Sequence, residues 1–359
     1  MTSLTVPARP DSGDASLRPL PWRRMAGVTW RQHRIALAGV AVLLAALAVW
    51  LWIAGTSVHH AWAAATTCQP TGSDACQDLA AAFNRTWNLM SIPAVLLLVV
   101  PAVIGAFAGA PVLARELETG TFRFAWTQGF DRWRWALAKL VALAVVLAGA
   151  GAAFGALVSW CYQPFAAAGN QDMGLYGDTP FAVVFGLREV TFPAWTLAVF
   201  ATGALAGMLI RRVVPAIVAA LAVYAGLAIA AAAFLRDHYL APLATSNPNV
   251  PGTAWIISQW WTKNGTFVFA GNPPDSLLNK FCTFPQFPVG KGGGGGGGGP
   301  SYSVNPFAQC LAPHGYTLWT SYQPASRFWP FQWIEAGWLL ALAALLIAAT
   351  IWLVHRRAA

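Results

Sequence analysis

Six apolar runs, most of them about twenty residues long, constrain this chain more than any other feature of its sequence. A helix needs about 20 mainly apolar residues to cross the roughly 30 Å hydrocarbon core of a bilayer. With 57% hydrophobic residues and a mean hydropathy of +0.52, the chain is too apolar for a soluble domain of this length. We therefore predict an all-α membrane protein with six transmembrane helices, at residues 35–54, 92–113, 135–161, 193–210, 213–234 and 333–354.

The lysine and arginine residues predict which way these helices cross the membrane. If the amino terminus is cytoplasmic, fourteen of the 22 Lys and Arg residues fall in cytoplasmic segments and seven in the longer outer segments. The positive-inside rule then places both termini in the cytoplasm. Because the basic residues lie at the ends of apolar runs, the formal charge of +9 does not indicate a nucleic-acid partner. The Arg-rich and Ala-rich composition indicates a bacterial protein, so we expect a multi-pass protein of the plasma membrane.

The amino-terminal region divides into two predicted segments. Residues 1–20 are rich in Pro, Ser, Asp and Arg without apolar periodicity, so we expect a disordered cytoplasmic tail. At 100° per residue, residues 21–34 form an amphipathic helix that lies at the interface, with its arginines at anionic lipid headgroups. Its membrane-surface residues are Trp22, Arg23, Arg24, Trp30, Arg31 and Arg34. The alternative is that this segment is only the basic flank of the first span, which we interpret as an uncleaved anchor.

A charged connection between the second and third runs, residues 114–140, is conspicuous in a chain with only 10% charged residues. Gly120 is suited to end the preceding helix, because glycine adopts the left-handed cap conformation at little cost. Thr121 is suited to cap a short helix that ends near Gln128. This short helix, residues 121–128, carries the bulky side chains of Phe122, Phe124 and Trp126. Such side chains on a cytoplasmic helix must pack against something, which indicates a docking surface.

The cysteines all fall on the predicted outer side of the membrane, where disulfides persist. Cys68 and Cys76 lie in the first outer loop, whereas Cys282 and Cys310 lie in the third. We predict one bridge within each pair, with Cys161 left over, although the sequence leaves other pairings open. We predict no metal site, because the chain lacks the CxxC spacing and nearby His pair typical of zinc sites.

The segment between the fifth and sixth spans, residues 235–328, is too long for a turn and predicts a large external loop domain. Its residues 255–261 resemble the aromatic belt of a membrane interface. An unbroken glycine run at 292–299 predicts a flexible tether, since it has no side chains to bury. The first five spans then occupy residues 35–234, and the last span with the cytoplasmic end occupies 329–359.

A search for catalytic motifs finds no Walker A sequence, no HExxH and no GxSxG. We therefore predict no catalytic residue and no cofactor bound by this chain. His238, Asp275 and His314 in the external segment keep two alternatives open, a membrane enzyme with an external active site and a membrane sensor or scaffold. We expect Lys139 and Glu335, which lie near the ends of spans, to reach the interface by snorkelling.

With these elements placed, the chain resembles an ABC-2 type permease, specifically the membrane subunit of an actinobacterial ABC exporter. The resemblance rests on the six-span topology, the basic amphipathic start, and Arg-Glu-x-Glu-x-Gly-Thr followed by a short helix and Arg-Trp-x-x-x-Lys. It implies that residues 121–128 form the coupling helix, which docks on a separate ATP-binding subunit. The implied docking residues are Glu116, Glu118, Gly120, Thr121, Phe122, Arg123, Phe124, Trp126 and Gln128.

The resemblance also implies a transport subunit and not an enzyme. ATP and Mg²⁺ belong to the partner subunit, and a second permease protomer, identical or different, completes the transport path among the membrane lipids. Alternating access then moves an amphipathic substrate, such as an antibiotic, a peptide or a lipid, outward. The large external segment departs from the simpler members of this family.

Overall fold

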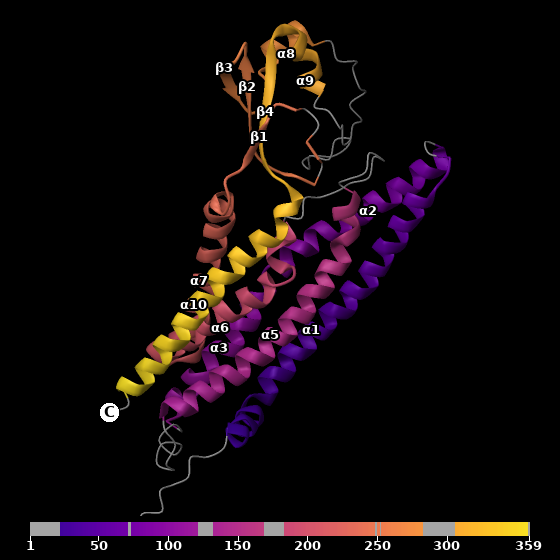
Figure 1. The fold of residues 1–359 in the computed structure, drawn as a ribbon. Coiled ribbons are helices and arrows are strands. Elements are labelled where there is room, and N and C mark those ends of the chain that lie inside the picture. The colour runs from indigo at the N-terminus through magenta and orange to yellow at the C-terminus, as the bar shows by residue number, and fades with distance from the viewer. Residues whose placement is uncertain are drawn as a thin grey trace, which may run out of the picture.

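The computed structural model describes residues 22–70, 73–120, 132–168, 183–247, 250–251, 253–282 and 306–357. Within these residues, six helices are long and apolar enough to cross a membrane. They lie at Arg31–Thr67, Pro93–Thr119, Trp133–Ala168, Thr191–Ile210, Val213–His238 and Ala325–Arg356. The six predicted spans are confirmed in place, and several of them are longer than predicted. They form an elongated bundle that carries a small domain at one end (Figure 1).

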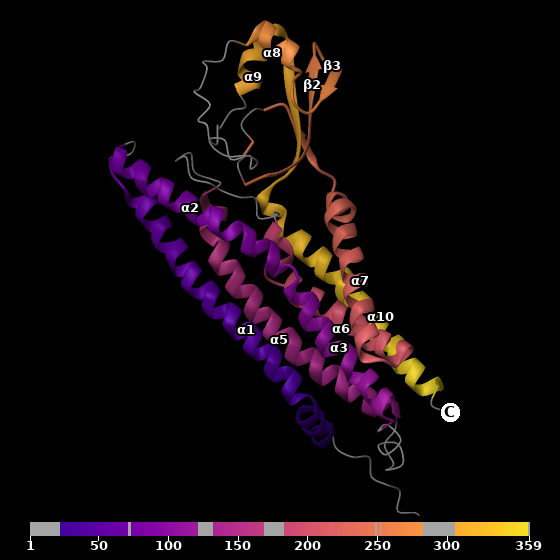
Figure 2. The ribbon, with the colours of Figure 1, turned by 180° about the vertical axis from the view of Figure 1, so that it is seen from behind.

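Among the described residues, seven long helices make up the bundle. They are α1 (Trp22–Thr67), α2 (Asp74–Leu97), α3 (Val100–Thr119), α5 (Arg132–Ala168), α6 (Thr191–Ile210), α7 (Val213–Ala230) and α10 (Phe328–Arg357). Short helical turns adjoin two of them: η1 (Val183–Leu187) before α6, and η2 (Ala231–Leu235) and η3 (Arg236–His238) after α7. The spans of α3 and α6 are largely buried, whereas those of α1, α7 and α10 are mostly exposed, as lipid-facing helices are. Both described ends of the chain lie opposite the small domain (Figure 2).

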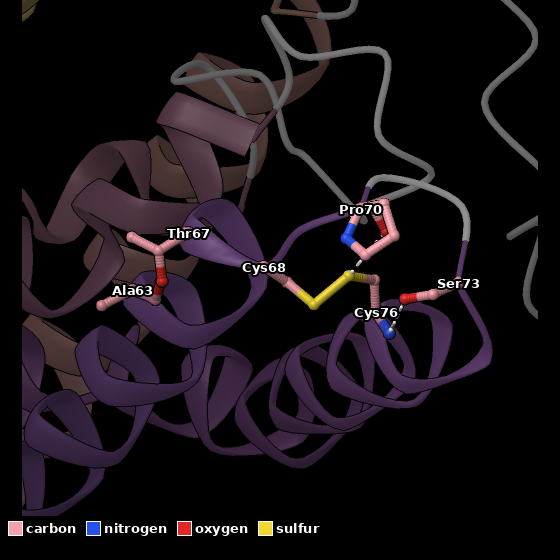
Figure 3. Close-up of a disulfide and its surroundings, with 6 residues drawn as sticks. All are labelled: Ala63, Thr67, Cys68, Pro70, Ser73 and Cys76. Atoms are coloured by element: carbon pink, nitrogen blue, oxygen red, sulfur yellow. Dashed lines mark hydrogen bonds between the residues drawn. A yellow bond between two sulfur atoms is a disulfide. The ribbon is translucent and has the colours of Figure 1, made fainter.

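α1 and α2 form a long hairpin that extends past the neighbouring helices (Figure 1). α1 has 46 residues. At 1.5 Å per residue it is about 70 Å long, more than twice the thickness of the hydrocarbon core. The predicted first outer loop is therefore mostly helix, and the Ser73 hydroxyl caps α2 by accepting a hydrogen bond from the Cys76 N–H at 3.3 Å. The Cys68–Cys76 disulfide closes the tip of the hairpin (Figure 3).

The predicted interfacial helix at residues 21–34 is part of α1, which continues from Trp22 into the first span without a break. The side chains of Arg31 and Arg34 are exposed. For Trp22, Arg23, Arg24 and Trp30 the structure describes the backbone and not the side chains. The whole segment 1–20 lies outside the described residues. The helical conformation agrees with the prediction, whereas its position at a membrane surface stays a prediction.

The second predicted span begins in α2 and ends in α3, because the helix is interrupted at Leu98 and Val99. The N–H groups of these two residues bond to carbonyls three residues back, each at 3.2 Å. Pro101 follows directly, and its missing N–H interrupts the α-helical hydrogen-bond ladder. The Tyr224 hydroxyl on α7 donates to the Leu98 carbonyl, so a polar backbone group at the break has a partner from a neighbouring helix.

The backbones of α3 and α6 pack in near contact through four glycines. Gly105 and Gly109 lie one turn apart on α3, and Gly203 and Gly207 lie one turn apart on α6. A Cβ atom at any of these positions would come within 2.2–2.8 Å of a backbone atom of the facing helix. Glycine is therefore required for this approach, which is the small-residue packing typical of membrane helices.

The described residues of the predicted external segment, which we call the external domain after that prediction, fold around a four-stranded antiparallel sheet. The prediction of an all-α protein is therefore wrong in this part. The strands, in the spatial order β1-β4-β2-β3, are β1 (Leu243–Thr245), β4 (Tyr316–Gln323), β2 (Trp255–Lys263) and β3 (Thr266–Ala270). Residues 255–261 form most of β2, which pairs with β4, and the aromatic and β-branched residues there favour a strand. Their position at a membrane interface stays a prediction. Asn264 and Gly265, with φ of 49° and 83°, form the tight turn to β3.

The helical side of the external domain consists of α8 (Asp275–Phe281), α9 (Pro306–Leu311) and η4 (Ala312–His314). Their apolar side chains join a small core around Trp261 and Leu318 of the sheet. The Cys282–Cys310 disulfide links α8 to α9. Both predicted cysteine pairs are thus present, and Cys161 is free and buried. The glycine run at 292–299 lies outside the described residues, and η5 (Ala325–Arg327) leads from the domain into α10.

Candidate functional site

The structure describes both flanks of the connection that carries the predicted docking surface. α3 ends at Thr119, and Gly120 follows with a φ of 70°, which is the left-handed cap expected of this glycine. α5 begins at Arg132 on the other side. The docking residues that lie outside the described residues are Thr121, Phe122, Arg123, Phe124, Trp126 and Gln128. The short helix at residues 121–128 therefore stays a prediction.

An ion pair between Glu116 and Lys139 joins these two flanks. The Lys139 side chain is only 2% exposed and that of Glu116 is 17% exposed. The Lys139 ammonium also lies 4.3 Å from the ring centroid of Trp135, one turn earlier on α5. Lys139 was expected to snorkel to the interface, and that expectation is wrong, because the side chain is held inside the bundle by its partner. The pair joins the last turns of α3 to the first turns of α5, between residues that are 23 positions apart in the sequence.

α1 reaches the same place through His33. This side chain lies within coulombic range of both Lys139 and Arg115. Its Nε2 atom and the Oε2 atom of Glu116 are buried without a hydrogen-bond partner among the described residues. Three helices, α1, α3 and α5, therefore bring ionisable side chains together at the flank of the connection.

Glu118 links the connection to a fourth helix. Its Oε2 atom accepts a hydrogen bond from the backbone N–H of Val213, the first residue of α7, at 3.4 Å. A carboxylate is favoured at this position, because the first N–H groups of a helix have no partner within the helix and carry partial positive charge. Arg211, with a φ of 58°, ends α6 just before this point, so Glu118 contacts the α6–α7 hairpin at its turn.

The structure therefore assigns the two glutamates of the motif to contacts inside the chain. Glu116 binds α5 and Glu118 binds α7, while Gly120 turns the chain away from α3. Both carboxylates contact other helices of the same chain, and the predicted contact of Glu116 and Glu118 with an ATP-binding subunit stays a prediction.

A second polar cluster lies within the bundle near the external domain, and no sequence motif marks it beyond the isolated charges. We call it the Glu335 network, and its members are Trp195, Arg236, Tyr239, Glu335 and Trp338. Arg236 binds the Glu335 carboxylate through Nε and Nη2, both at 2.8 Å. The side chain of Glu335 is fully buried. Snorkelling was expected for Glu335 as well, and the burial of its carboxylate shows that this expectation is wrong.

The residues that supported an external active site lie on three different elements, η3, η4 and α8. His238 is in η3 at the foot of the domain, where its Nδ1 atom lies 2.7 Å from the Phe234 carbonyl oxygen. His314 is in η4 and packs on Phe281, with ring centroids 4.2 Å apart. Asp275 begins α8, on the far side of the domain from the bundle (Figure 1). No group of three or more His, Cys, Asp or Glu side chains suited to a metal ion occurs among the described residues.

A comparison with protein families supplies the remaining evidence on identity. No curated protein and no solved structure matches the chain. A family model described as "ABC-2 membrane transporter related" matches residues 41–236, which is more than half of the chain. The match extends from within α1 to Arg236, the first residue of η3, and includes the connection together with Glu116, Glu118 and Lys139. This multi-pass membrane protein therefore belongs to the ABC-2 membrane transporter related family.

Proposed function

We propose that the chain is the permease subunit of an ATP-driven ABC exporter in a bacterial plasma membrane. It moves an amphipathic substrate, of the class of antibiotics, peptides or lipids, outward across the membrane. A separate ATP-binding subunit docks on the predicted coupling helix at residues 121–128, and it binds and hydrolyses ATP with Mg²⁺. Both termini and the connection lie on the cytoplasmic side, and two permease protomers form the transport path.

The observation that carries this proposal is the Glu116–Lys139 pair within the part of the chain that matches the family. The pair holds the ends of α3 and α5 together at the base of the connection, and Glu118 adds the start of α7. A partner that contacts residues 121–128 differently before and after ATP hydrolysis would shift all three helices. Such differential contact is what a conformational equilibrium needs if it is to be driven.

The large external domain does not favour an enzyme over a transporter. His238 and His314 lie at different levels of the domain, one at its foot and one beside α8. Catalytic acids and bases must lie within hydrogen-bond reach of one reacting group, directly or through one water. We therefore assign the chain to transport, with ATP hydrolysis in the partner.

Copurification from the native host followed by mass spectrometry tests the proposal. Tagged wild-type protein should recover an ABC ATP-binding subunit, and the variant Phe124→Ala/Trp126→Ala should lose both that subunit and substrate efflux. The matched control is Phe267→Ala, which removes a 63% exposed aromatic side chain from the external domain. It should still recover the ATP-binding subunit. Recovery of the subunit by the double variant together with unchanged efflux would refute docking on this segment.

A further inference from the structure

The chain passes between the bundle and the external domain at two places, and they lie side by side. The outgoing segment consists of η3 and the residues that lead to β1, and the returning segment runs from the end of β4 through η5 into α10. The Glu335 network connects these two segments. Arg236 and Tyr239 belong to the outgoing segment, and Glu335 and Trp338 belong to α10 after the return.

The Glu335 carboxylate is the centre of this connection. Besides the two hydrogen bonds from Arg236, it accepts one from Trp195 Nε1 at 2.9 Å and one from the Tyr239 hydroxyl at 3.3 Å. Trp338 Nε1 in turn donates to the Tyr239 hydroxyl oxygen at 2.9 Å. Because Trp195 is on α6, three parts of the bundle converge on one buried carboxylate. A charge buried in this way is stable only while its partners stay in place.

A second set of hydrogen bonds lies one step closer to the sheet. The Gln323 side-chain amide donates to the Leu240 carbonyl at 2.7 Å. Arg327 Nη1 donates to the Ala241 carbonyl at 2.7 Å and to the Gln323 side-chain oxygen at 2.6 Å. The outgoing and returning segments are therefore linked at two levels. The Glu335 network links them within the bundle, and the hydrogen bonds of Gln323 and Arg327 link them next to the sheet.

We propose that the Glu335 network fixes the external domain to the bundle, so that the domain moves as one body with α7 and α10. Two single-chain crossings without cross-links would act as hinges and let the domain swing freely. Here the bidentate Arg236–Glu335 pair links the outgoing segment to α10, and Trp195 links the same carboxylate to α6. Any movement of α7 or α10 relative to the rest of the bundle is then transmitted to the external domain. This inference concerns the external domain and does not depend on ATP-driven transport.

Distance measurement between two spin labels on the full-length protein in lipid nanodiscs tests this inference. One label is attached at Ser258→Cys, an exposed position of β2, and the other at Ala152→Cys, an exposed position of α5. The background carries Cys161→Ala so that only these two thiols react. The otherwise wild-type protein should give one narrow distance distribution. Glu335→Gln removes the charge at nearly constant shape, and it should broaden or split that distribution.

Amide exchange provides an independent readout of the same attachment. In Glu335→Gln, peptides that cover residues 236–245 should exchange faster by about tenfold or more, because a buried charge that loses its partner destabilises its surroundings strongly. Asp237→Asn is the matched control. It removes a carboxylate from η3, next to Arg236, that does not belong to the Glu335 network. It should leave both the distances and the exchange unchanged.

Arg236→Lys keeps the proposal testable if Glu335→Gln is not recovered as a monodisperse protein. Lysine retains the charge but cannot make the bidentate contact, so the domain should loosen while the bundle stays folded. A narrow, unshifted distance distribution together with wild-type exchange in whichever variant is monodisperse would overturn the proposal. It would mean that the domain is held by its covalent connections and the second set of hydrogen bonds alone.

Discussion

Gly109 on α3 lies so close to Phe200 on α6 that a Cβ atom on the glycine would be 2.2 Å from the Phe200 carbonyl oxygen. The obstructing atom belongs to the backbone, so no rotamer change relieves the contact. The same holds for Gly207, where a Cβ atom would be 2.6 Å from the Ala110 carbonyl oxygen. The two most buried spans of the bundle therefore depend on glycine for their packing.

Gly109→Ala should destabilise the protein by about 1–3 kcal/mol, the usual cost of forcing an extra carbon into a well-packed interior. Gly149→Ala on α5 is the matched control, because a Cβ atom there meets nothing within 4 Å. It should stabilise slightly, since alanine favours a helix over glycine by roughly 0.8–1 kcal/mol. Thermal unfolding in detergent, followed by fluorescence-detected size exclusion, measures both variants. Equal midpoints for the two would contradict the α3–α6 contact.

Local features of the sequence account for the parts of the fold that could be predicted. The length and apolarity that a membrane span needs are properties of one continuous segment, so the predicted spans lie at the correct places. The left-handed cap at Gly120 follows from the conformational freedom of one residue. The cysteine pairs followed from the loops that hold them, and each pair is close in sequence, with separations of 8 and 28 residues.

Long-range pairing accounts for the parts that could not be predicted. β2 finds its partner β4 about sixty residues later, and Arg236 finds Glu335 at a separation of 99 residues. No local pattern specifies which distant strand or charge will be the partner. Two further features of the sequence are local signals of this fold: Ser73 at the start of α2 is a typical helix cap, and the paired glycines on α3 and α6 are typical of tight membrane packing.

The ion pair between Glu116 and Lys139 should behave as a unit. Lys139→Met leaves the Glu116 carboxylate without its ion-pair partner, and breaking a buried pair in this way costs roughly 3–5 kcal/mol. The double variant Glu116→Gln/Lys139→Met removes both charges, so it should recover most of that loss. Thermal unfolding of the purified proteins gives the comparison, with Arg31→Met, at an exposed position of α1, as the control. Additive losses in the double variant would show that the two side chains do not interact.

Thiol counting tests the two disulfides and the burial of Cys161 together. Native protein should react with no more than trace amounts of a polar maleimide, because its one free cysteine is buried. Unfolding without reductant should expose one thiol per chain, and unfolding with reductant should expose all 5 cysteines of the sequence. Cys161→Ala is the control and should give none before reduction. Three reactive thiols in the unreduced, unfolded protein would mean that one bridge is absent.

Alkaline pH should reveal the environment of Tyr239, which lies just beyond the fifth span. Burial raises the pKa of its phenol, and the neighbouring Glu335 charge raises it further. The folded protein then keeps the proton at a pH where the unfolded chain, with an ordinary tyrosine pKa of about 10, releases it. Tyr239 therefore contributes stability that is fully present below about pH 10 and is lost as the pH rises above it. Unfolding midpoints at about pH 8 and pH 11 should differ less in Tyr239→Phe than in the wild type, and Tyr322→Phe in β4 serves as the control. An equal pH dependence in the wild type and Tyr239→Phe would show that this phenol ionises as readily in the folded protein as in the unfolded chain.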